Sequence, residues 1–206
     1  MIIVPDDPGE AAVDEVLQAT VIKVFDGDGF LARVWNPHRE AWVDRVPFRF
    51  AFIDAPEMEQ PCGPESRQFL FNLIQGKSLR LDPVGKESTG YVPVDQYSRM
   101  LCMAFLAEQM SIGEVTYFRD GKTASGVVRN TRLVIRNIEL EMVVNGWAWV
   151  TEQYAFDREA DYFGAQDDAR YHRRGLWAMN NPEPPWNFKR RLRRRASMSR
   201  NQGRLL

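Results

Sequence analysis

Alternating hydrophobic and polar positions predict two β-strands near the start of the chain. Residues 17–25 and 30–35 are rich in β-branched and aromatic residues. Between them lies the sequence Asp26-Gly27-Asp28-Gly29, which is typical of a tight turn. The pattern therefore predicts a hairpin that places two aspartates at one end of a sheet.

A third strand is predicted at about 45–53, where the apolar residues alternate with Pro47, Arg49 and Ala51; they are Val46, Phe48, Phe50 and Phe52. Successive side chains of a strand point to opposite faces. Arg49 is therefore expected on the face away from the phenylalanines.

Two further strands and a helix complete the first half of the chain. Pro64 lies near the start of a helix that is expected to run from 63 to about 75 and to end at Gly76. Strands are predicted at 79–84 and at 97–106. Five short strands with a helix between the third and the fourth predict a mainly β, α+β fold, namely a five-stranded OB-fold barrel with about three helices.

The second half of the chain is expected to add two helices and one hairpin. One helix is predicted at 138–145 and a longer one from Asp157 to about Arg174, each followed by glycine. Residues 114–119 and 127–135 could pair as a hairpin around Asp120-Gly121. Leu176-Trp177 is expected to pack back on the core.

These patterns divide the chain into three parts. Residues 1–16 form an acidic N-terminal extension, and residues 17–180 form one domain with an insertion at about 108–132. Residues 181–206 are first proline-rich and then basic, so ordered structure is expected to end near Phe188.

The net charge of −1 hides a strong asymmetry. Residues 1–20 carry five acidic residues and no basic one, whereas residues 189–206 carry eight basic residues and no acidic one. A basic segment of this density attracts a polyanion such as DNA, RNA or an anionic membrane. A disordered, solvated tail is the alternative, and the sequence favours neither.

Composition excludes several classes of protein. Two histidines are too few for a His-based zinc or HNH nuclease centre, and no apolar run approaches the ~18 residues of a membrane span. Cys62 and Cys102 lack metal-ligand spacing and are expected to be free thiols, with a disulfide between them as the alternative. No signal peptide is visible, which slightly favours the cytoplasm over non-classical export, and a monomer is expected.

Acidic residues and arginines gather in three short segments at predicted strand ends. The segments are Asp26-Gly27-Asp28, then Arg49 with Ile53-Asp54-Ala55-Pro56-Glu57, and Asp95-Gln96-Tyr97-Ser98-Arg99. Hard divalent cations prefer oxygen ligands, and phosphodiester cleavage needs positive charge directed at the transition state. Each segment alone could be a simple turn or a surface charge. In this order and spacing, the three segments together are a much more specific signal than any one of them.

In these segments the sequence resembles the staphylococcal nuclease (thermonuclease) family, over roughly Val21 to Trp177 without the insertion. Gly-Pro-Glu at 63–65, Gly-Trp-Ala at 146–148 and Gly-Leu-Trp at 175–177 extend the resemblance. It implies a barrel fold and a Ca²⁺-dependent endonuclease that acts on DNA and/or RNA and leaves 3′-phosphates.

The resemblance also implies a role for each matching residue. Asp28 and Asp54 would bind Ca²⁺ through their carboxylates, and Ala55 would bind it through its carbonyl. Glu57 would be the general base or position the attacking water. Arg49 and Arg99 would hold the scissile phosphate, each contributing ~3 kcal/mol or more to transition-state stabilisation. Tyr97 and Tyr154 match tyrosines that lie near the nucleotide.

Some positions depart from the family pattern. Gly29 stands where threonine is usual, Gln96 replaces a lysine, Glu152 replaces a tyrosine, and the stretch between Glu57 and Gly63 is short. We expect these changes to alter affinity and substrate preference without removing a catalytic group.

Two alternatives remain open at this point. Barrels of this kind also occur as non-catalytic modules that bind nucleic acid or protein after losing their acidic residues and arginines, but this chain retains all five of those side chains. The insertion contains aromatic and basic residues that could extend a single-strand groove. A lengthened hairpin without a special role is the simpler interpretation.

Overall fold

The computed structural model describes residues 16–36, 39–84, 94–111, 115–119, 122–126, 131–151, 156 and 158–202. Ten strands, four α-helices and a 3₁₀ turn are assigned within those ranges. The strands are β1 (Leu17–Val24), β2 (Gly29–Asn36), β3 (Ala41–Phe50), β4 (Ile53–Asp54), β5 (Ser78–Pro83), β6 (Met100–Ser111), β7 (Val115–Arg119), β8 (Lys122–Gly126), β9 (Thr131–Asn137) and β10 (Trp149–Val150). The helices are α1 (Gly63–Ile74), α2 (Ile138–Val144), α3 (Glu159–Tyr171) and α4 (Pro185–Gln202), with the 3₁₀ turn at Gly175–Ala178.

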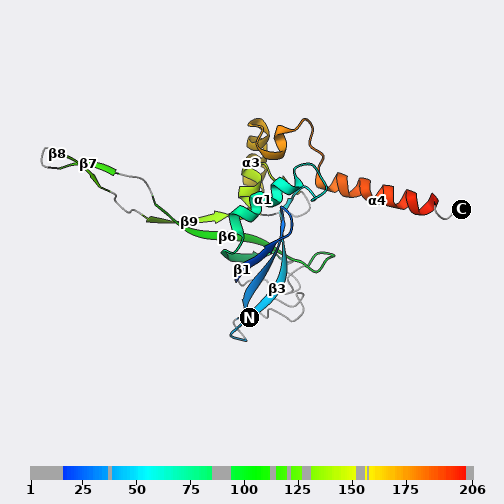
Figure 1. Cartoon of the computed structure of the whole chain (residues 1–206), viewed down its shortest axis with the longest axis horizontal. Coiled ribbons are helices and arrows are strands. Elements are labelled where there is room, and N and C mark those ends of the chain that lie inside the picture. The colour runs from blue at the N-terminus through cyan, green and yellow to red at the C-terminus, as the bar shows by residue number, and fades with distance from the viewer. Residues whose placement is uncertain are drawn as a thin grey trace.

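Five strands close into a barrel (Figure 1). Their order is β3-β2-β1-β5-β6, and neighbours along this order are antiparallel. The barrel closes because β3 also pairs in parallel with β6, with Phe48 opposite Met100 and Phe50 opposite Cys102. The predicted five-stranded barrel is therefore confirmed.

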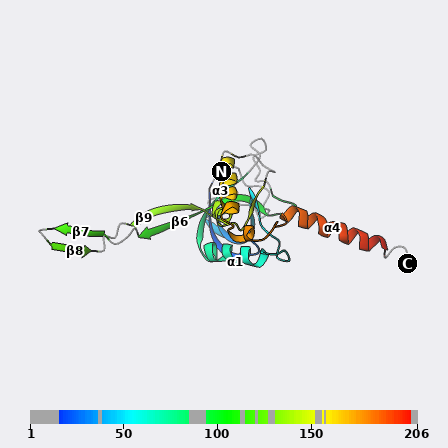
Figure 2. The ribbon, with the colours of Figure 1, turned by 90° about the horizontal axis from the view of Figure 1, so that it is seen from above.

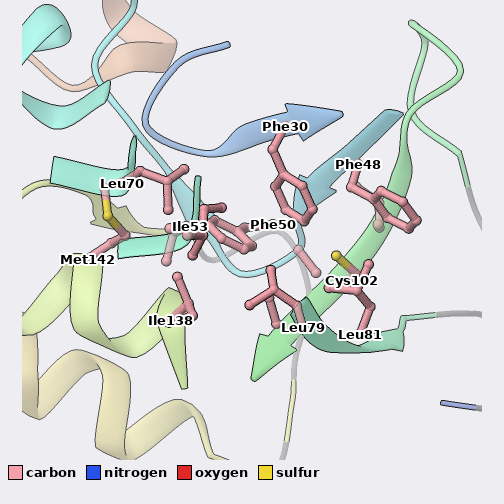
Figure 3. Close-up of a cluster of buried hydrophobic side chains, with 14 of the residues drawn as sticks. Phe30, Phe48, Phe50, Ile53, Leu70, Leu79, Leu81, Cys102, Ile138 and Met142 are labelled. Carbon is pink, nitrogen blue, oxygen red and sulfur yellow. The ribbon is translucent and has the colours of Figure 1, made fainter. Parts of the chain in front are cut away.

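Aromatic and aliphatic side chains fill the inside of the barrel (Figure 3). Phe30, Phe48 and Phe50 are fully buried, and the ring centroids of Phe30 and Phe48 lie 5.5 Å apart. The alternation predicted for the third strand is confirmed up to Phe50, because Arg49 lies between buried phenylalanines and is itself only half-buried. It is wrong beyond Phe50, where β3 ends and the chain bends so that Ala51 and Phe52 are both buried. Both cysteines are free, with Cys102 inside the core and Cys62 partly exposed.

Helices α1, α2 and α3 cover the barrel, and the start of α1 and the end of α2 match the sequence expectations. Proline lies in the first turn of α1, as expected, and Asn137 caps α2 by accepting a hydrogen bond from the Leu140 N–H at 3.1 Å. Gly146 ends α2 with φ +71°, and a Cβ there would lie 2.2 Å from the Arg174 carbonyl oxygen. Glycine is thus required where the two segments meet. Asp157, the predicted cap of α3, lies outside the described residues, and α3 begins at Glu159.

The insertion forms a ribbon whose pairing differs from the prediction. β9 pairs with β6 from Phe105–Asn137 to Ser111–Thr131, and β7 pairs with β8 at the far end. The predicted partner of 114–119 was 127–135, but its partner is 122–126. Residues 131–135 instead continue the sheet, because pairing with an existing edge strand is available to them. The ribbon extends away from the barrel (Figures 1 and 2).

The C-terminal segment corrects another prediction. Ordered structure does not end near Phe188, because α4 continues to Gln202 and leaves the barrel on the side opposite the ribbon (Figure 2). Arginine and lysine are good helix formers, so a run of basic residues can continue a helix that is anchored at its start. No helix among the described residues has the length and apolarity needed to cross a membrane.

Candidate active site

The β1–β2 turn delivers Asp28 to the rim of the barrel. The turn closes with a hydrogen bond from the Phe25 N–H to the Gly29 carbonyl at 2.9 Å, and Asp26 accepts the Asp28 N–H at 3.1 Å. A Cβ on Gly27 would lie 2.0 Å from Ser66 Oγ, so glycine is needed for the turn to pack on α1. The predicted hairpin is therefore confirmed, and it places Asp28 at the rim of the barrel.

Arg49 links two acidic residues that are 26 positions apart in the chain. Its Nη2 lies 2.9 Å from Asp54 Oδ1 and 3.4 Å from Asp28 Oδ2. The Ala55 N–H donates to Asp28 Oδ2 at 3.1 Å, which ties the two segments together. Asp54 itself is held by the short β4–β10 pairing, where it lies opposite Trp149.

Arg99 is fixed from within its own turn. The Asp95 carboxylate accepts the backbone N–H groups of Tyr97 and Arg99 at 2.8 and 3.0 Å and binds the Arg99 guanidinium at 2.7 Å. Although burial opposes the shift, these hydrogen bonds from Arg99 and Tyr97 hold the pKa of Asp95 below its usual value. Tyr97 is 66% exposed and lies beside the Arg99 guanidinium.

Lys189 enters the site from α4. Its Nζ lies 3.0 Å from Asp54 Oδ1 and 2.7 Å from Glu57 Oε1. The start of α4 is anchored on the barrel by the buried Phe188 and by a two-point ion pair of Arg191 with Glu183 at 2.8 and 3.1 Å. This anchoring places Lys189 between two acidic side chains that precede it by more than 130 residues.

These groups line one hollow of about 780 Å³. The barrel and its turns contribute acidic residues and two arginines, and α4 contributes Lys189, Leu192 and Arg193. The residues from the barrel side are Asp26, Asp28, Arg49, Glu57, Val94, Asp95, Gln96, Tyr97, Arg99 and Leu101.

Two acidic residues of the hollow, Asp26 and Asp28, and the adjacent Asp54 differ in their proton affinity. Burial, and then the charge of Asp28, raise the pKa of Asp54 to about 6 and that of Asp26 to about 7. The pKa of Asp28 is lowered, because Arg49 and the Ala55 N–H outweigh the effect of burial. Like-charged carboxylates crowded in this way gain stability from an added cation.

The donor set suits a hard divalent cation. Asp28, Asp54 and the Ala55 backbone offer oxygen, the ligand atom that Ca²⁺ prefers. Burial and then the nearby charge of Asp28 raise the pKa of Asp54, and a bound cation would offset both effects. No three Asp, Glu, His or Cys side chains of the described residues converge as a ready-made site. Ca²⁺ takes 6–8 oxygen ligands in general, so water and substrate oxygens would have to complete the coordination.

The structure brings together most of the residues that the sequence singled out. Asp28, Arg49, Asp54 and Ala55 are joined by hydrogen bonds, and Glu57 and Arg99 line the same hollow. Tyr97 is at its edge, whereas Tyr154 lies outside the described residues.

Sequence reasoning missed Lys189 as a site residue and did not assign Asp95 a role. Asp95 could have been found from its place four residues before Arg99 in a turn, since aspartate commonly binds backbone N–H groups two or more residues on. Lys189 gave no such signal, because residues 189–206 contain eight basic residues and the sequence does not distinguish one of them from the others.

Comparisons with known proteins agree with this geometry. A sequence model of a family described as staphylococcal nuclease homologue matches residues 47–179. An uncharacterized endonuclease of Haemophilus influenzae is 31% identical over 170 residues, which cover 82% of this chain and 71% of that protein. A micrococcal nuclease of Shigella flexneri is 28% identical over 82% of this chain and 79% of that protein. A probable staphylococcal-like nuclease of Oryza sativa subsp. japonica is 31% identical over 73% of this chain but only 31% of its own length.

Proposed function

Because the chain belongs to the staphylococcal nuclease homologue family, we propose that it is a calcium-dependent nuclease that hydrolyses DNA and/or RNA to 3′-phosphate products. The observation that carries the proposal is the joining of Arg49, Asp28 and Asp54 at one rim of the barrel, with Glu57 and Arg99 in the same hollow. A phosphodiester is the substrate class that matches two arginines facing a group of oxygen ligands.

The two arginines are assigned to the scissile phosphate. The Nε of Arg49 is buried without a hydrogen-bond partner among the described residues, which supports a missing acceptor such as a phosphate oxygen. Arg99 is oriented by Asp95 and can offer its remaining N–H groups to the same phosphate. Removing one such donor from an oxyanion site typically costs about 10²–10³ in rate.

Glu57 is assigned to the attacking water. Its half-buried carboxylate lines the hollow and can accept a proton from water as the water oxygen bonds to phosphorus. The P–O5′ bond then breaks, the O5′ atom leaves with the electron pair and takes up a proton, and the 3′-phosphate keeps the water oxygen. Lys189 must release Glu57 before this carboxylate can act.

Asp28, Asp54 and the Ala55 carbonyl are the groups proposed to hold Ca²⁺. When bound, the ion would neutralise phosphate charge and polarise the phosphoryl oxygens. Arg49 already bridges the two carboxylates, so it would lie next to both the ion and the phosphate.

The experiment that tests the proposal is cleavage of a labelled single-stranded DNA with Ca²⁺, with Mg²⁺ and with EDTA, using the parent and Glu57→Ser. We expect cleavage with Ca²⁺ only, 3′-phosphate ends, and a loss of about 10²-fold or more in the variant. Arg33→Gln, on the exposed part of β2, is the matched control and should cleave like the parent.

The alternative function is a non-catalytic binding module, and one structural observation favours it. Arg49 and Lys189 neutralise Asp54 and Glu57 within the protein itself, as expected if these carboxylates no longer serve catalysis. Oligonucleotide binding without cleavage under any metal condition would therefore replace the nuclease proposal.

A further inference from the structure

Helix α4 carries a second hollow that is continuous with the candidate active site. This hollow, of about 510 Å³, is lined by α4 alone. It shares Lys189 and Arg193 with the larger hollow that contains Arg49 and Arg99. A ligand chain in the active site can therefore continue past these two shared residues along α4.

The lining of the second hollow has the chemistry of a single-strand binding surface. Arg190, Arg193 and Arg194 supply cationic donors, and Trp186, at 43% exposure, supplies an aromatic face. Charged grooves with exposed aromatic rings bind single strands by phosphate contact and base stacking. Side chains four residues apart on a helix are separated by ~6 Å along its axis, so successive donors can meet different phosphates.

The arginines of this face are available to a ligand. Arg191, on another side of α4, is committed to Glu183. Among the described residues, no acidic side chain forms an ion pair with Arg193 or Arg194, and α4 contains seven basic residues and no acidic one. The positive charge of this face is thus uncompensated along its length.

We propose that a single strand of nucleic acid extends from the catalytic hollow along α4, with Arg193 and Arg194 on its phosphates and Trp186 against a base. The inference rests on the proposed function and adds the form of the substrate, which is a single strand several nucleotides longer than the dinucleotide at the scissile bond. An extended strand gains contacts on α4 that a dinucleotide does not reach.

The test measures binding by the non-cleaving Glu57→Ser protein with Ca²⁺ present. Fluorescent single strands of about 2 and about 12 nucleotides are titrated at several salt concentrations. We expect Arg193→Gln to weaken binding of the longer strand several-fold more than binding of the dinucleotide, and to reduce the salt slope of the longer strand by about 0.7. Arg195→Gln is the matched control, since it removes the same charge about 200° around the same helix.

Equal effects of Arg193→Gln and Arg195→Gln would overturn the proposal, because α4 would then act only as diffuse charge. An unchanged affinity in Arg193→Gln/Arg194→Gln would overturn it as well. Both results come from binding measurements and do not depend on cleavage. They can therefore overturn the proposal for α4 while the nuclease proposal, which is tested by product formation, still stands.

A separate observation concerns Lys189 alone. Its ammonium group contacts Asp54, a proposed calcium ligand, and Glu57, the proposed base. A lysine and a divalent cation repel each other when they share one group of carboxylates. Occupation of these oxygens by Lys189 therefore opposes occupation by a metal ion.

We infer that Lys189 is an internal cation that competes with Ca²⁺ for the acidic residues of the site. In the calcium-free protein it offsets their charge, and calcium binding requires it to give up at least the Asp54 contact. This inference also rests on the proposed function, but its test uses neither substrate nor cleavage.

The test is calcium titration by calorimetry on the full chain and on Lys189→Met, Lys189→Gln and Lys189→Arg. Calcium no longer has to displace this partly buried ion pair once the charge of Lys189 is removed, which corresponds to about a tenfold change in calcium affinity. We expect about tenfold tighter calcium binding in the two uncharged variants and parent-like binding in Lys189→Arg. Thermal unfolding should show a lower calcium-free Tm in the uncharged variants and a larger rise on adding Ca²⁺.

Unchanged or weaker calcium binding in folded Lys189→Met and Lys189→Gln would overturn the inference and make Lys189 a simple tether for α4. Circular dichroism establishes that the variants are folded. The Lys189→Arg protein separates the effect of charge from that of the particular side chain.

Discussion

Asp95, to which the sequence analysis gave no role, orients the predicted catalytic residue Arg99. It binds two backbone N–H groups of its own turn and the side chain of Arg99, so it fixes both the turn and the direction of the guanidinium. Gly29 has a related effect, since a Cβ there would lie 2.9 Å from Asp26 Oδ1 and 3.2 Å from Arg99 Nη1. The threonine that is usual in the family would crowd both groups unless they moved.

Arg99→Ala is expected to lower kcat by about 10²–10³-fold, because a preorganised donor to the phosphate is lost. Asp95→Asn should cause a smaller loss, since Arg99 remains but is less well oriented. Single-turnover cleavage of a labelled oligonucleotide measures both effects. A parent-like rate in folded Arg99→Ala would remove Arg99 from the proposed mechanism.

Glu139 is a fully buried carboxyl outside the site. It accepts the Phe52 N–H at 2.6 Å and lies 3.3 Å from the Tyr162 hydroxyl. Burial is the main reason why its pKa is raised to about 8. The folded protein thus holds this proton more tightly than the unfolded chain does.

Folding stability is therefore expected to fall as pH rises between about 4.5 and 8 through the Glu139 contribution. Glu139→Gln keeps the shape but cannot ionise, so its pH slope in this window should be smaller by up to about 1.4 kcal/mol per pH unit. Urea unfolding of the two proteins at several pH values measures the difference. The exposed Glu65→Gln serves as control, and an identical slope in Glu139→Gln would show that Glu139 is ionised when folded.

The β6–β9 ribbon is an element that the barrel does not need for closure. The barrel closes through β3 and β6 near Phe48 and Met100, whereas the ribbon continues outward from that part of β6 (Figure 1). Its far end belongs to a separate two-stranded sheet of β7 and β8. Length variation is tolerated in such positions.

Replacing residues 110–132 by Asn-Gly should therefore leave the barrel intact, because Gln109 and Leu133 are paired and can be joined by a tight turn. The Tm is expected to stay within about 3 °C of the parent, which corresponds to about 1 kcal/mol. Cleavage of short oligonucleotides should not change. A weaker affinity for long single strands in the shortened protein would instead assign the ribbon a binding role.

The arrangement of the whole chain depends on how α4 is docked. Trp186 contacts Trp149 with ring centroids 5.7 Å apart, the Gln60 side chain donates to the Glu183 carbonyl, and Phe188 is 6% exposed. These contacts lie at the N-terminal end of α4, while the rest of the helix extends away from the barrel (Figure 2). The position of Lys189 in the site depends on this short anchored segment.

Phe188→Ala is expected to release α4 without unfolding the barrel, since a buried phenylalanine truncated to alanine typically costs about 3–5 kcal/mol and this contact is local to the helix. Hydrogen exchange should become faster across 185–202 and stay unchanged in the barrel strands. Met198→Ala, at an exposed position of the same helix, is the control. Faster exchange throughout the barrel in Phe188→Ala would show that α4 belongs to the cooperative core.

The sequence alone determined the barrel and most of the candidate site. Strand alternation fixed which face Arg49 occupies, and the turn sequences around Asp28 and Asp54 fixed where the chain reverses, because these are local properties of the backbone. The resemblance in three motifs then indicated which residues act together.

Tertiary structure alone decided the strand partners of the insertion and the place of Lys189. Residues 131–135 had two possible partners of similar pattern, and only the exposed edge of β6 selects between them. Lys189 reaches Asp54 because packing of Phe188 and the Arg191–Glu183 ion pair set the direction of α4. Contacts between residues so distant in sequence depend on how the elements pack, and neither charge nor periodicity along the chain encodes them locally.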